Sequence, residues 1–343
     1  MFKKLFGGFS KKKDLTNLLE WVNAYNRENI YKEVHLDQLE FLHIGGNVDT
    51  LDYIPEEIEY LVNLKELTFD KNSISEVPKS IAKLKNLKTL IFKDMPLKSV
   101  PAEIFELENL EYLTFGRTDM TELPREIGNL KRLKYLNLYT SKFKSLPDEI
   151  CECQELEVLE IFGSDIEVLP NNIGKLKNLE TLDMNNSKIQ ILPDSFVELE
   201  KIVNLKLSSA KDFHKLPDNI GDMKNLEAIY LSRTLLESIP ESIGDLVSLK
   251  LLDLEATKLT SLPNSIVNLK NLEMLILLKT KVTELPQEIA EIKKLKIATK
   301  RVETKLENII TEDVIPLRIE LEKGVTKTET IFDLKSINGE MLP

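Results

Sequence analysis

The sequence contains two cysteines and three histidines, the residue types that most readily bind metals or act as nucleophiles. Cys151 and Cys153 are separated by one residue, a spacing that could suit a metal site or a redox pair. The histidines are spread along the chain, at His35, His43 and His214. Because they also occupy unrelated places in the repeat described below, they predict neither a metal site nor a nucleophilic triad.

The sequence also lacks two common phosphate-binding motifs. It contains neither a GxxxxGK[ST] loop nor a GxGxxG turn. The net charge of −11 and the isoelectric point near 5.1 oppose binding to a phosphate backbone, so we expect no nucleic acid partner. We therefore predict that the chain is not an enzyme and needs no cofactor and no metal.

The composition is typical of a folded protein in a reducing compartment. Hydrophobic residues make up 42% and charged residues 30% of the sequence, and two cysteines cannot staple a chain of 343 residues. No apolar run reaches the ~18–20 residues of a membrane-spanning helix. The N-terminus also lacks the apolar stretch of a secretory signal. We expect a cytoplasmic protein.

A repeat with a period of about 23 residues organises most of the chain. Its clearest marker is a proline that recurs at this constant interval, which is lengthened by a single residue only between Pro193 and Pro217. The series consists of Pro55, Pro78, Pro101, Pro124, Pro147, Pro170, Pro193, Pro217, Pro240, Pro263 and Pro286. A fixed period of this length is typical of stacked repeats, in which each repeat buries its apolar side against the next.

Each repeat begins with a short predicted strand. If Leu133 is position 1 of a repeat, Leu136 and Leu138 occupy positions 4 and 6. Alternate side chains of a strand point to opposite faces, so positions 4 and 6 point into the core. The proline follows on the returning arm, where its fixed φ and missing N–H suit a chain that leaves the sheet. Cys153 fills an inward leucine position and Cys151 a glycine position, so we interpret both as small core residues.

The pattern resembles the leucine-rich repeat family over about residues 39–294, three quarters of the chain. The sequence LPxxIGxLxNLxxLxL is almost complete in residues 169–184 and 262–277. The resemblance implies an α/β leucine-rich-repeat solenoid, a curved horseshoe of about 11 repeats with a parallel β-sheet on its concave face. The repeat length and the LPxxI arm are most similar to the intracellular Ras-group subclass, whose members bind small GTPases, phosphatases and scaffolds.

Position 9 departs from the family pattern, which has asparagine there. In the family, the asparagine amides bond neighbouring backbones in a ladder. Most repeats of this chain carry serine or threonine at position 9, while Met95 and Ala210 have no hydroxyl. We expect the serines and threonines to make a shorter hydroxyl ladder.

Both ends of a stacked array need caps, because each end exposes an unpaired strand and an apolar surface. Residues 14–38 predict a helical N-terminal cap with Asp14 as its N-cap. Its apolar residues at helical spacing are Leu15, Leu18, Leu19, Val22 and Tyr25, with Trp21 beside them. Residues 295–343 predict a C-terminal α/β cap or a small appended unit. It would hold a helix with Val302, Leu306, Ile309 and Ile310 and a strand with Ile315, Leu317, Ile319 and Leu321.

Residues 1–13 form a basic N-terminal segment that has two interpretations. The segment holds five lysines, and its apolar residues recur at helical spacing at Phe2, Leu5, Phe6 and Phe9. One interpretation is a disordered tail, because Gly7 and Gly8 would interrupt a helix. The other is membrane contact, in which the apolar side enters the surface of an anionic bilayer.

Positions 3, 5, 7 and 8 of each repeat point away from the core, so the fold does not dictate their residues. In repeats four to six, these positions bring aromatic residues together with charged residues at the border. We name this set the aromatic cluster: Tyr112, Arg117, Tyr135, Tyr139, Val158, Glu160, Phe162 and Asp183. Tyrosine and arginine are enriched in binding hot spots, although aromatic side chains also pack on one another across strands. We predict partner binding at this cluster.

A second group of outward positions is apolar and lies in the last two repeats. We name it the apolar patch: Leu251, Met274, Ile276 and Leu278. If it were exposed to water, such a patch would favour association with other apolar surfaces. Three explanations are open, namely coverage by the C-terminal segment, self-association, and a further partner site.

Together these observations predict a non-catalytic recognition module or scaffold that binds a protein partner on its concave face. The carboxylates of Glu160 and Asp183 favour a partner with basic residues. The alternative is a membrane-peripheral scaffold that is attached through its basic amphipathic N-terminus and recruits a partner with its repeats.

Overall fold

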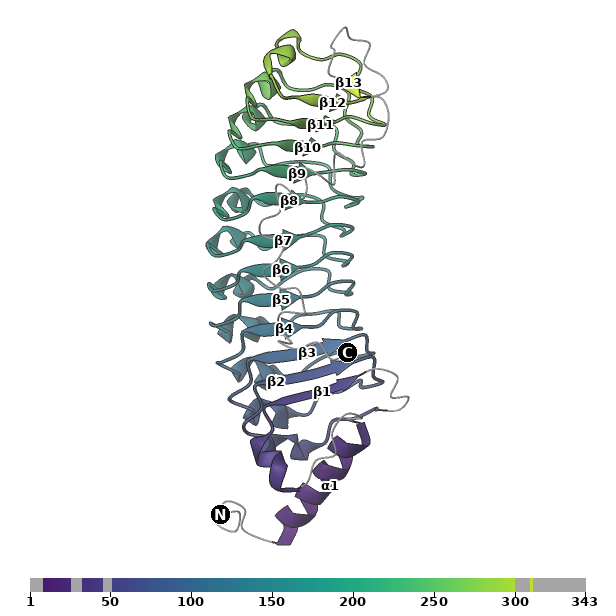
Figure 1. Cartoon of the computed structure of the whole chain (residues 1–343), viewed down its shortest axis with the longest axis vertical. Helices are drawn as coiled ribbons and strands as arrows, with labels where there is room; N and C mark the ends of the chain where they lie inside the picture. Colours follow the sequence, from purple (N-terminus) through teal and green to yellow (C-terminus); the bar gives the residue numbers. More distant parts are fainter. Residues whose placement is uncertain (1–8, 26–32, 46–50, 300–308, 311–343) are drawn as a thin grey trace. The chain divides into compact units, whose positions relative to one another are not determined.

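The computed structural model describes residues 9–25, 33–45, 51–299 and 309–310 of the chain (Figure 1). The chain divides into two compact units, Met1–Ile189 and Gln190–Pro343. We describe them separately as the N-terminal half and the C-terminal half. In each half, short parallel strands alternate with short 3-10 helices, as expected for a leucine-rich-repeat solenoid.

The strands of the N-terminal half form a parallel sheet in sequence order. They are β1 (Phe41–Gly45), β2 (Glu66–Asp70), β3 (Thr89–Lys93), β4 (Tyr112–Thr114), β5 (Tyr135–Asn137), β6 (Val158–Glu160) and β7 (Thr181–Asp183). Equivalent repeat positions pair with each other, so that Leu113 lies opposite Leu136 and Tyr135 opposite Val158. Positions 3 to 5 of each repeat thus lie in a strand, which confirms the predicted frame.

The strands of the C-terminal half also pair in parallel and in sequence order. They are β8 (Asn204–Lys206), β9 (Ala228–Tyr230), β10 (Leu251–Asp253), β11 (Met274–Ile276), β12 (Lys296–Ala298) and β13 (Ile309–Ile310). The parallel pairing therefore continues beyond residue 294, where the sequence repeat fades.

The helix predicted through Ile309 and Ile310 is wrong at these two residues. They form β13, which pairs with Ile297 and Ala298 of β12. The unpaired edge of β12 offers backbone hydrogen bonds that outweigh the weak helical spacing of the sequence. The other residues of the predicted helix, and the strand predicted through residues 315–321, lie outside the described residues.

The returning arm of each repeat contains a 3-10 helix. These helices are η3 (Glu56–Tyr60), η4 (Lys79–Lys83), η5 (Ala102–Glu106), η6 (Arg125–Asn129), η7 (Asp148–Glu152), η8 (Ile173–Lys175), η9 (Asp194–Glu198), η10 (Ile220–Asp222), η11 (Glu241–Asp245), η12 (Asn264–Asn268) and η13 (Gln287–Glu291), and a further 3-10 helix, η2 (Glu33–Gln38), precedes β1. In most repeats the recurring proline stands directly before the helix. Pro78, for example, has φ −71° and ψ 149°, and its carbonyl accepts the N–H of Ile81 at 3.3 Å.

Aromatic stacking reinforces the core of the first repeats. Phe69, Phe92 and Phe115 occupy position 6 of consecutive repeats and are fully buried. The rings of Phe69 and Phe92 are 5.6 Å apart and those of Phe92 and Phe115 are 6.0 Å apart, with interplanar angles of 3° and 1°. Trp21 closes the N-terminal end of this phenylalanine stack, 6.4 Å from Phe69.

The helix α1 (Phe9–Tyr25) carries Trp21 and covers the first repeats. Leu15, Leu18 and Val22 are buried, as predicted. The predicted start at Asp14 is wrong, because the helix begins at Phe9 and Asp14 lies inside it. No residue between Phe9 and Asp14 breaks a helix, and lysine is a good helix former. The interpretation of residues 1–13 as a disordered tail therefore fails for residues 9–13, and residues 1–8 lie outside the described residues.

The hydroxyl ladder predicted at position 9 does not form between repeats. Thr118 donates a hydrogen bond to the carbonyl of Phe115 at 2.9 Å, and Thr257 bonds Leu254 in the same way, so each hydroxyl closes a turn of its own repeat. The short hydroxyl arm cannot reach the preceding strand. The longer amide of Asn72 can, and it donates to the carbonyl of Ile44 at 3.1 Å.

A ladder of side-chain hydrogen bonds does exist, but on the arm that leads into each strand. The asparagine of the LxNL motif donates to a backbone carbonyl of the preceding repeat. In the N-terminal half these pairs include Asn86 with Val62 and Asn109 with Lys85, both at 2.9 Å. In the C-terminal half, Asn271 bonds Val247 at 2.7 Å. The motif asparagine therefore takes over the bridging that was expected of position 9.

Position 8 adopts the left-handed backbone region in the repeats of β2 to β11. The φ value is 52° at Arg117, 56° at Ala256 and 65° at Gly163. The turn that follows each strand requires this conformation, which costs a residue with a Cβ atom about 1–2 kcal/mol and glycine almost nothing.

We expect opposite effects from two substitutions at position 8. Gly163→Ala should lower the free energy of unfolding by about 1 kcal/mol, because the new Cβ atom is strained at positive φ. Its Cβ would also lie 3.1 Å from Oγ1 of Thr140. Ala256→Gly should leave stability unchanged or raise it by up to about 1 kcal/mol. Urea denaturation measures both values, and a loss of stability in both variants would contradict the assigned conformation.

Candidate protein-recognition surface

The aromatic cluster lies on the outer face of the sheet in the N-terminal half, which is the face opposite the core. Tyr112 in β4 and Tyr135 in β5 have ring centroids 6.1 Å apart and planes tilted by 36°. Tyr139 and Phe162, in the turns that follow β5 and β6, stack at 5.3 Å with an angle of 7°. The sheet register thus brings four rings from consecutive repeats together, as the sequence frame predicts.

Arg117 extends the stacked pair. Its guanidinium carbon lies 5.5 Å from the centroid of the Tyr139 ring, within the range of a cation–π contact. Nη1 of Arg117 also donates to Oδ1 of Asp94 at 3.2 Å, and this bond raises the pKa of Arg117. Arg117, Tyr139 and Phe162 form a row across three repeats. Arg117 and Phe162 are exposed, and 39% of Phe162 is accessible to solvent.

Gly116 provides the floor on which the Tyr139 ring rests. A Cβ atom at Gly116 would lie 2.1 Å from Cε1 and 2.5 Å from Cδ1 of Tyr139. The ring therefore packs against the backbone of the turn that follows β4, and any larger residue at position 116 would displace it.

A hydrogen-bond network fixes the other side of the cluster. The hydroxyl of Tyr135 donates to Oε2 of Glu160 at 2.7 Å, and the amide of Asn137 donates both to this hydroxyl, at 3.0 Å, and to Glu160. Oδ1 of Asn137 accepts the backbone N–H of Tyr139 at 2.9 Å. Burial and the nearby Glu160 carboxylate raise the pKa of Tyr135. The network therefore links the positions of Tyr135 and Tyr139 through a single amide.

The remaining predicted residues differ in their accessibility. Val158 is buried beneath its neighbours, with 7% of its surface exposed. Asp183 is half-buried, and its Oδ1 accepts the backbone N–H of Asn185 at 3.0 Å. Sequence reasoning missed Asp94, Gly116 and Asn137. All three occupy outward positions of the repeat, which was the available signal, but none is of a type that stands out in binding sites.

The geometry at Gly116 predicts how Tyr139 titrates. Burial and the Asp94 carboxylate raise the pKa of Tyr139 to about 12. The neutral phenol is thus favoured in the folded state, so this contribution to stability is complete below pH ~10 and is lost as the pH rises through about 12. We expect Gly116→Ala to move the ring into solvent and to lower the pKa of Tyr139 towards the ordinary value of ~10.

Absorbance of tyrosinate against pH, compared with a Tyr139→Phe chain to assign the signal, measures this shift. Because the displaced atoms belong to a side chain that can adopt another rotamer, Gly116→Ala should change the free energy of unfolding by less than ~1 kcal/mol. An unchanged titration of Tyr139 would mean that the ring does not rest on Gly116.

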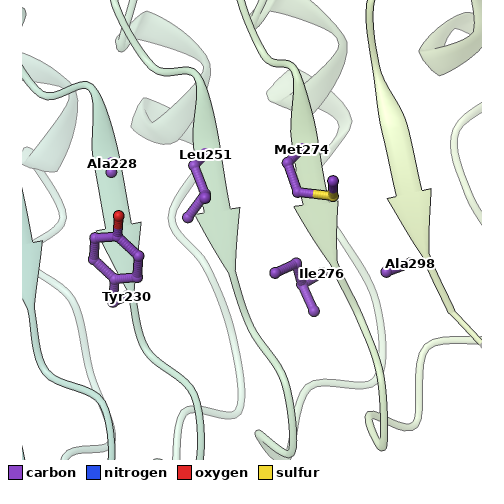
Figure 2. Close-up of a cluster of buried hydrophobic side chains, with 6 residues drawn as sticks. All are labelled: Ala228, Tyr230, Leu251, Met274, Ile276 and Ala298. Atoms are coloured by element: carbon purple, nitrogen blue, oxygen red, sulfur yellow. The ribbon is translucent and has the colours of Figure 1, made fainter. Parts of the chain in front are cut away.

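The apolar patch lies on β10 and β11 in the C-terminal half, on the face opposite the core residues Leu252 and Leu275. Leu251, Met274 and Ile276 are buried, and Leu278 is half-buried against them. Ala228, Tyr230 and Ala298 complete the buried group (Figure 2). The patch is therefore not open to water in this structure.

Cys151 and Cys153 are free, buried thiols. Burial raises the pKa of Cys151 to about 11 and that of Cys153 to about 12, which keeps both protonated at neutral pH. Sγ of Cys153 donates to the carbonyl of Ile127 at 3.2 Å. Both residues thus have the properties of small core side chains.

Metal-binding and membrane-crossing features are absent from the part of the chain that the structure describes. Within it, no group of three His, Cys, Asp or Glu side chains is placed to hold a metal ion. None of its helices combines the length and the apolar character that a membrane crossing requires.

Sequence comparison supports the repeat in the middle of the chain. Residues 155–241 match a family model described as a leucine-rich repeat region. Among proteins with curated descriptions, none matches the chain.

Structure comparison gives many similar chains. A plant peptide hormone receptor, RGFR1 in complex with RGF2, is 27% identical with a TM-score of 0.57, over 78% of this chain and 49% of the receptor chain. The GASSHO1/SCHENGEN3 receptor kinase ectodomain of Arabidopsis thaliana, in complex with CASPARIAN STRIP INTEGRITY FACTOR 2, is 26% identical with a TM-score of 0.55, over 72% of this chain and 34% of that chain.

The structure of a bacterial protein matches this chain over most of the length of both chains. The internalin InlF of Listeria monocytogenes is 17% identical with a TM-score of 0.62, over 92% of this chain and 93% of that chain. This likeness concerns the fold alone, and the chain spans about half or less of the plant receptor chains it matches. The structure described here thus has the fold of the leucine-rich-repeat solenoids, and its middle repeats match the sequence model of that family.

Proposed function

We propose that this chain is a non-catalytic recognition module that binds another protein on the outer face of its N-terminal half, centred on Tyr139 and Phe162. The observation that carries the proposal is the row formed by Arg117 and these two stacked rings. Large aromatic and guanidinium groups that lie together on a surface are the usual composition of an interface hot spot.

The rigidity of the surface supports this function. Gly116 and the Asn137 amide hold Tyr139, and the parallel sheet fixes the spacing between repeats. A partner that binds a preformed surface loses less free energy to the ordering of side chains and loops. The fold itself is commonly a protein-interaction module, and the two plant receptors above were solved in complexes with RGF2 and CASPARIAN STRIP INTEGRITY FACTOR 2.

The charges around the rings favour a basic partner. Glu160 and Asp183 lie on one side of the row and Asp94 on the other, and Arg117 is paired with Asp94. The charges of Glu111 and Glu157 add to burial in raising the pKa of Tyr112, so carboxylates surround that ring as well. A lysine or arginine of the partner would find both aromatic faces and carboxylates there.

We also propose a cytoplasmic location, on the basis of the sequence resemblance. The repeat length and the LPxxI arm support a cytoplasmic module of the Ras-group type, with a role in signalling or scaffolding. Within the described residues, nothing supports membrane attachment through the N-terminus.

The experiment is affinity capture from a lysate of the source cells, with bound proteins quantified by mass spectrometry. We expect a partner that the unsubstituted chain holds and that Tyr139→Ala/Phe162→Ala holds at least about 30-fold more weakly, which corresponds to the ~2 kcal/mol of a hot spot.

Tyr53→Ala is the matched control. Tyr53 is 54% exposed but lies outside the sheet, so its removal should leave capture unchanged. Circular dichroism must be the same for all variants. A partner retained equally by the double variant would place the site elsewhere on the molecule and would refute the proposed centre.

A further inference from the structure

Charged residues gather in the turns that follow the strands, at positions 8 and 10 of each repeat. In the repeats of β2 to β7, these positions hold the basic residues Lys71, Arg117, Lys142 and Lys188 and the acidic residues Asp94, Asp119 and Asp165. In the repeats of β8 to β11, the same positions hold basic residues and no acidic residue. We name this second set the basic edge: Lys211, Arg233, Lys258, Lys279 and Lys281.

The acidic residues of the N-terminal half neutralise their basic neighbours. Nζ of Lys142 lies 2.7 Å from Oδ1 of Asp119, and Nζ of Lys188 lies 2.7 Å from Oδ1 of Asp165. Both ion pairs join position 10 of one repeat to position 10 of the next. Equivalent turn residues of neighbouring repeats are thus close enough for their charged groups to meet.

The basic edge of the C-terminal half has a different arrangement. Nζ of Lys279 lies 2.8 Å from Oε1 of Glu255. Among the residues that the structure describes, Arg233, Lys258 and Lys281 form no ion pair, and all three are exposed. Three consecutive repeats therefore each present a basic side chain to water without a carboxylate to neutralise it.

Backbone hydrogen bonds fix the spacing of the turns that carry these side chains, which follow the stacked strands β9 to β11 (Figure 1). The N–H of Lys258 donates to the carbonyl of Leu236 at 3.0 Å, and the N–H of Lys281 donates to that of Leu259 at 2.9 Å. Because neighbouring strands are ~4.8 Å apart, the ammonium groups of Lys258 and Lys281 repel each other. A carboxylate bound between them would relieve this repulsion.

We propose that the basic edge binds an acidic segment of another protein. Carboxylates of this partner would lie between basic side chains of consecutive repeats, as Asp119 and Asp165 do in the N-terminal half. Leu235 lies at position 10 between Lys211 and Lys258 and is 37% exposed, so it offers the same segment an apolar contact. The proposal is independent of the function assigned to the aromatic cluster, which favours a basic partner.

The size of the edge and the charge of the chain favour an acidic protein segment over a bilayer or a nucleic acid. Three strand spacings of ~4.8 Å separate β8 from β11, so the edge spans about 15 Å. An extended segment of about five residues covers this length. The whole chain has a net charge of −11, so the surrounding surface would repel a long polyanion or an anionic bilayer that touched the edge.

Fluorescence anisotropy of a labelled oligoglutamate of about eight residues tests the proposal with the full-length chain. We expect saturable binding that weakens as the salt concentration rises from ~50 to ~300 mM, because the contacts involve exposed charges. Lys258→Ala/Lys281→Ala should bind the peptide about five- to tenfold more weakly, with unchanged circular dichroism. A failure of the unsubstituted chain to bind the peptide at ~50 mM salt would refute the proposal.

Lys142→Ala/Lys188→Ala is the matched control. It removes the same charge from position 10 of two repeats, but these lysines are already paired with Asp119 and Asp165, so peptide binding should change by less than about twofold. Equal weakening in both double variants would show that only the net charge matters and would refute the basic edge as the site. Sedimentation with phosphatidylserine vesicles that is lost in Lys258→Ala/Lys281→Ala would identify a bilayer as the partner and would also overturn the assignment.

Lys258→Asp tests the repulsion between repeats directly. The substitution recreates at position 10 the acid–base pair that Asp165 and Lys188 form, with Lys281 as the base. We expect a higher urea midpoint at low salt, together with weaker binding of the oligoglutamate. A lower midpoint or unchanged peptide binding would contradict the proposal.

Discussion

Truncation of Phe92 to alanine is expected to lower the free energy of unfolding by about 3–5 kcal/mol, the usual range for a fully buried phenylalanine. Phe92 is the middle ring of the phenylalanine stack, between Phe69 and Phe115. Its loss would open a cavity between two repeats that cannot collapse without changing the strand spacing, because backbone hydrogen bonds fix the distance between β2, β3 and β4.

Urea denaturation of the two chains provides the measurement, followed by a signal from the N-terminal half such as Trp21 fluorescence. Phe162→Ala serves as the comparison, because this ring is 39% exposed and its removal should cost less than ~1 kcal/mol. Equal losses for Phe92 and Phe162 would show that the stack does not support the core.

Gly221→Ala is expected to cost about 1–3 kcal/mol, although it adds a single methyl group. A Cβ atom at Gly221 would lie 2.1 Å from the carbonyl oxygen of Ser242 in the next repeat. The obstacle is backbone, which cannot move aside without shifting η11 (Glu241–Asp245) relative to η10 (Ile220–Asp222). The glycine of the LPxxIG motif is thus required by the close approach of the next arm rather than by its own φ.

The same argument predicts an order among equivalent glycines. The corresponding distance is 2.4 Å from Gly244 to the Ser265 carbonyl and 2.7 Å from Gly128 to the Glu149 carbonyl. Losses in urea denaturation should therefore decrease from Gly221→Ala through Gly244→Ala to Gly128→Ala. Ala82 already occupies this position in an earlier repeat, and Ala82→Gly should cost no more than ~1 kcal/mol. A reversed order would show that the arms adjust freely.

The repeat frame allowed much of the fold to be predicted from sequence. Leu136 and Phe92 occupy inward positions that recur once in every repeat, and the strands and their register follow from that recurrence. The same frame placed Tyr112, Tyr135, Tyr139 and Phe162 on one face, and the rings do come together there. Partner binding at this face stays a prediction.

The features that could not be predicted from the sequence depend on side-chain length or on contacts with distant parts of the chain. Side-chain length decides whether a polar group can bridge two repeats. The hydroxyl of Thr118 bonds within its own repeat, whereas the longer amide of Asn86 bonds the preceding repeat. The strand at Ile309 depends on an unpaired edge that local helical spacing does not reveal. The burial of Met274 at an outward position could not be read from the repeat frame, and the sequence alone left three explanations open.

The asparagine ladder has a consequence for how the chain is made. The bonds of Asn86, Asn109 and Asn178 each reach back into the preceding repeat, 24 positions earlier in the sequence. A growing polypeptide therefore meets the acceptor for each new repeat already in place. Such a chain can fold as it leaves the ribosome, with α1 and Trp21 as the first template and a constant, low contact order at every later step.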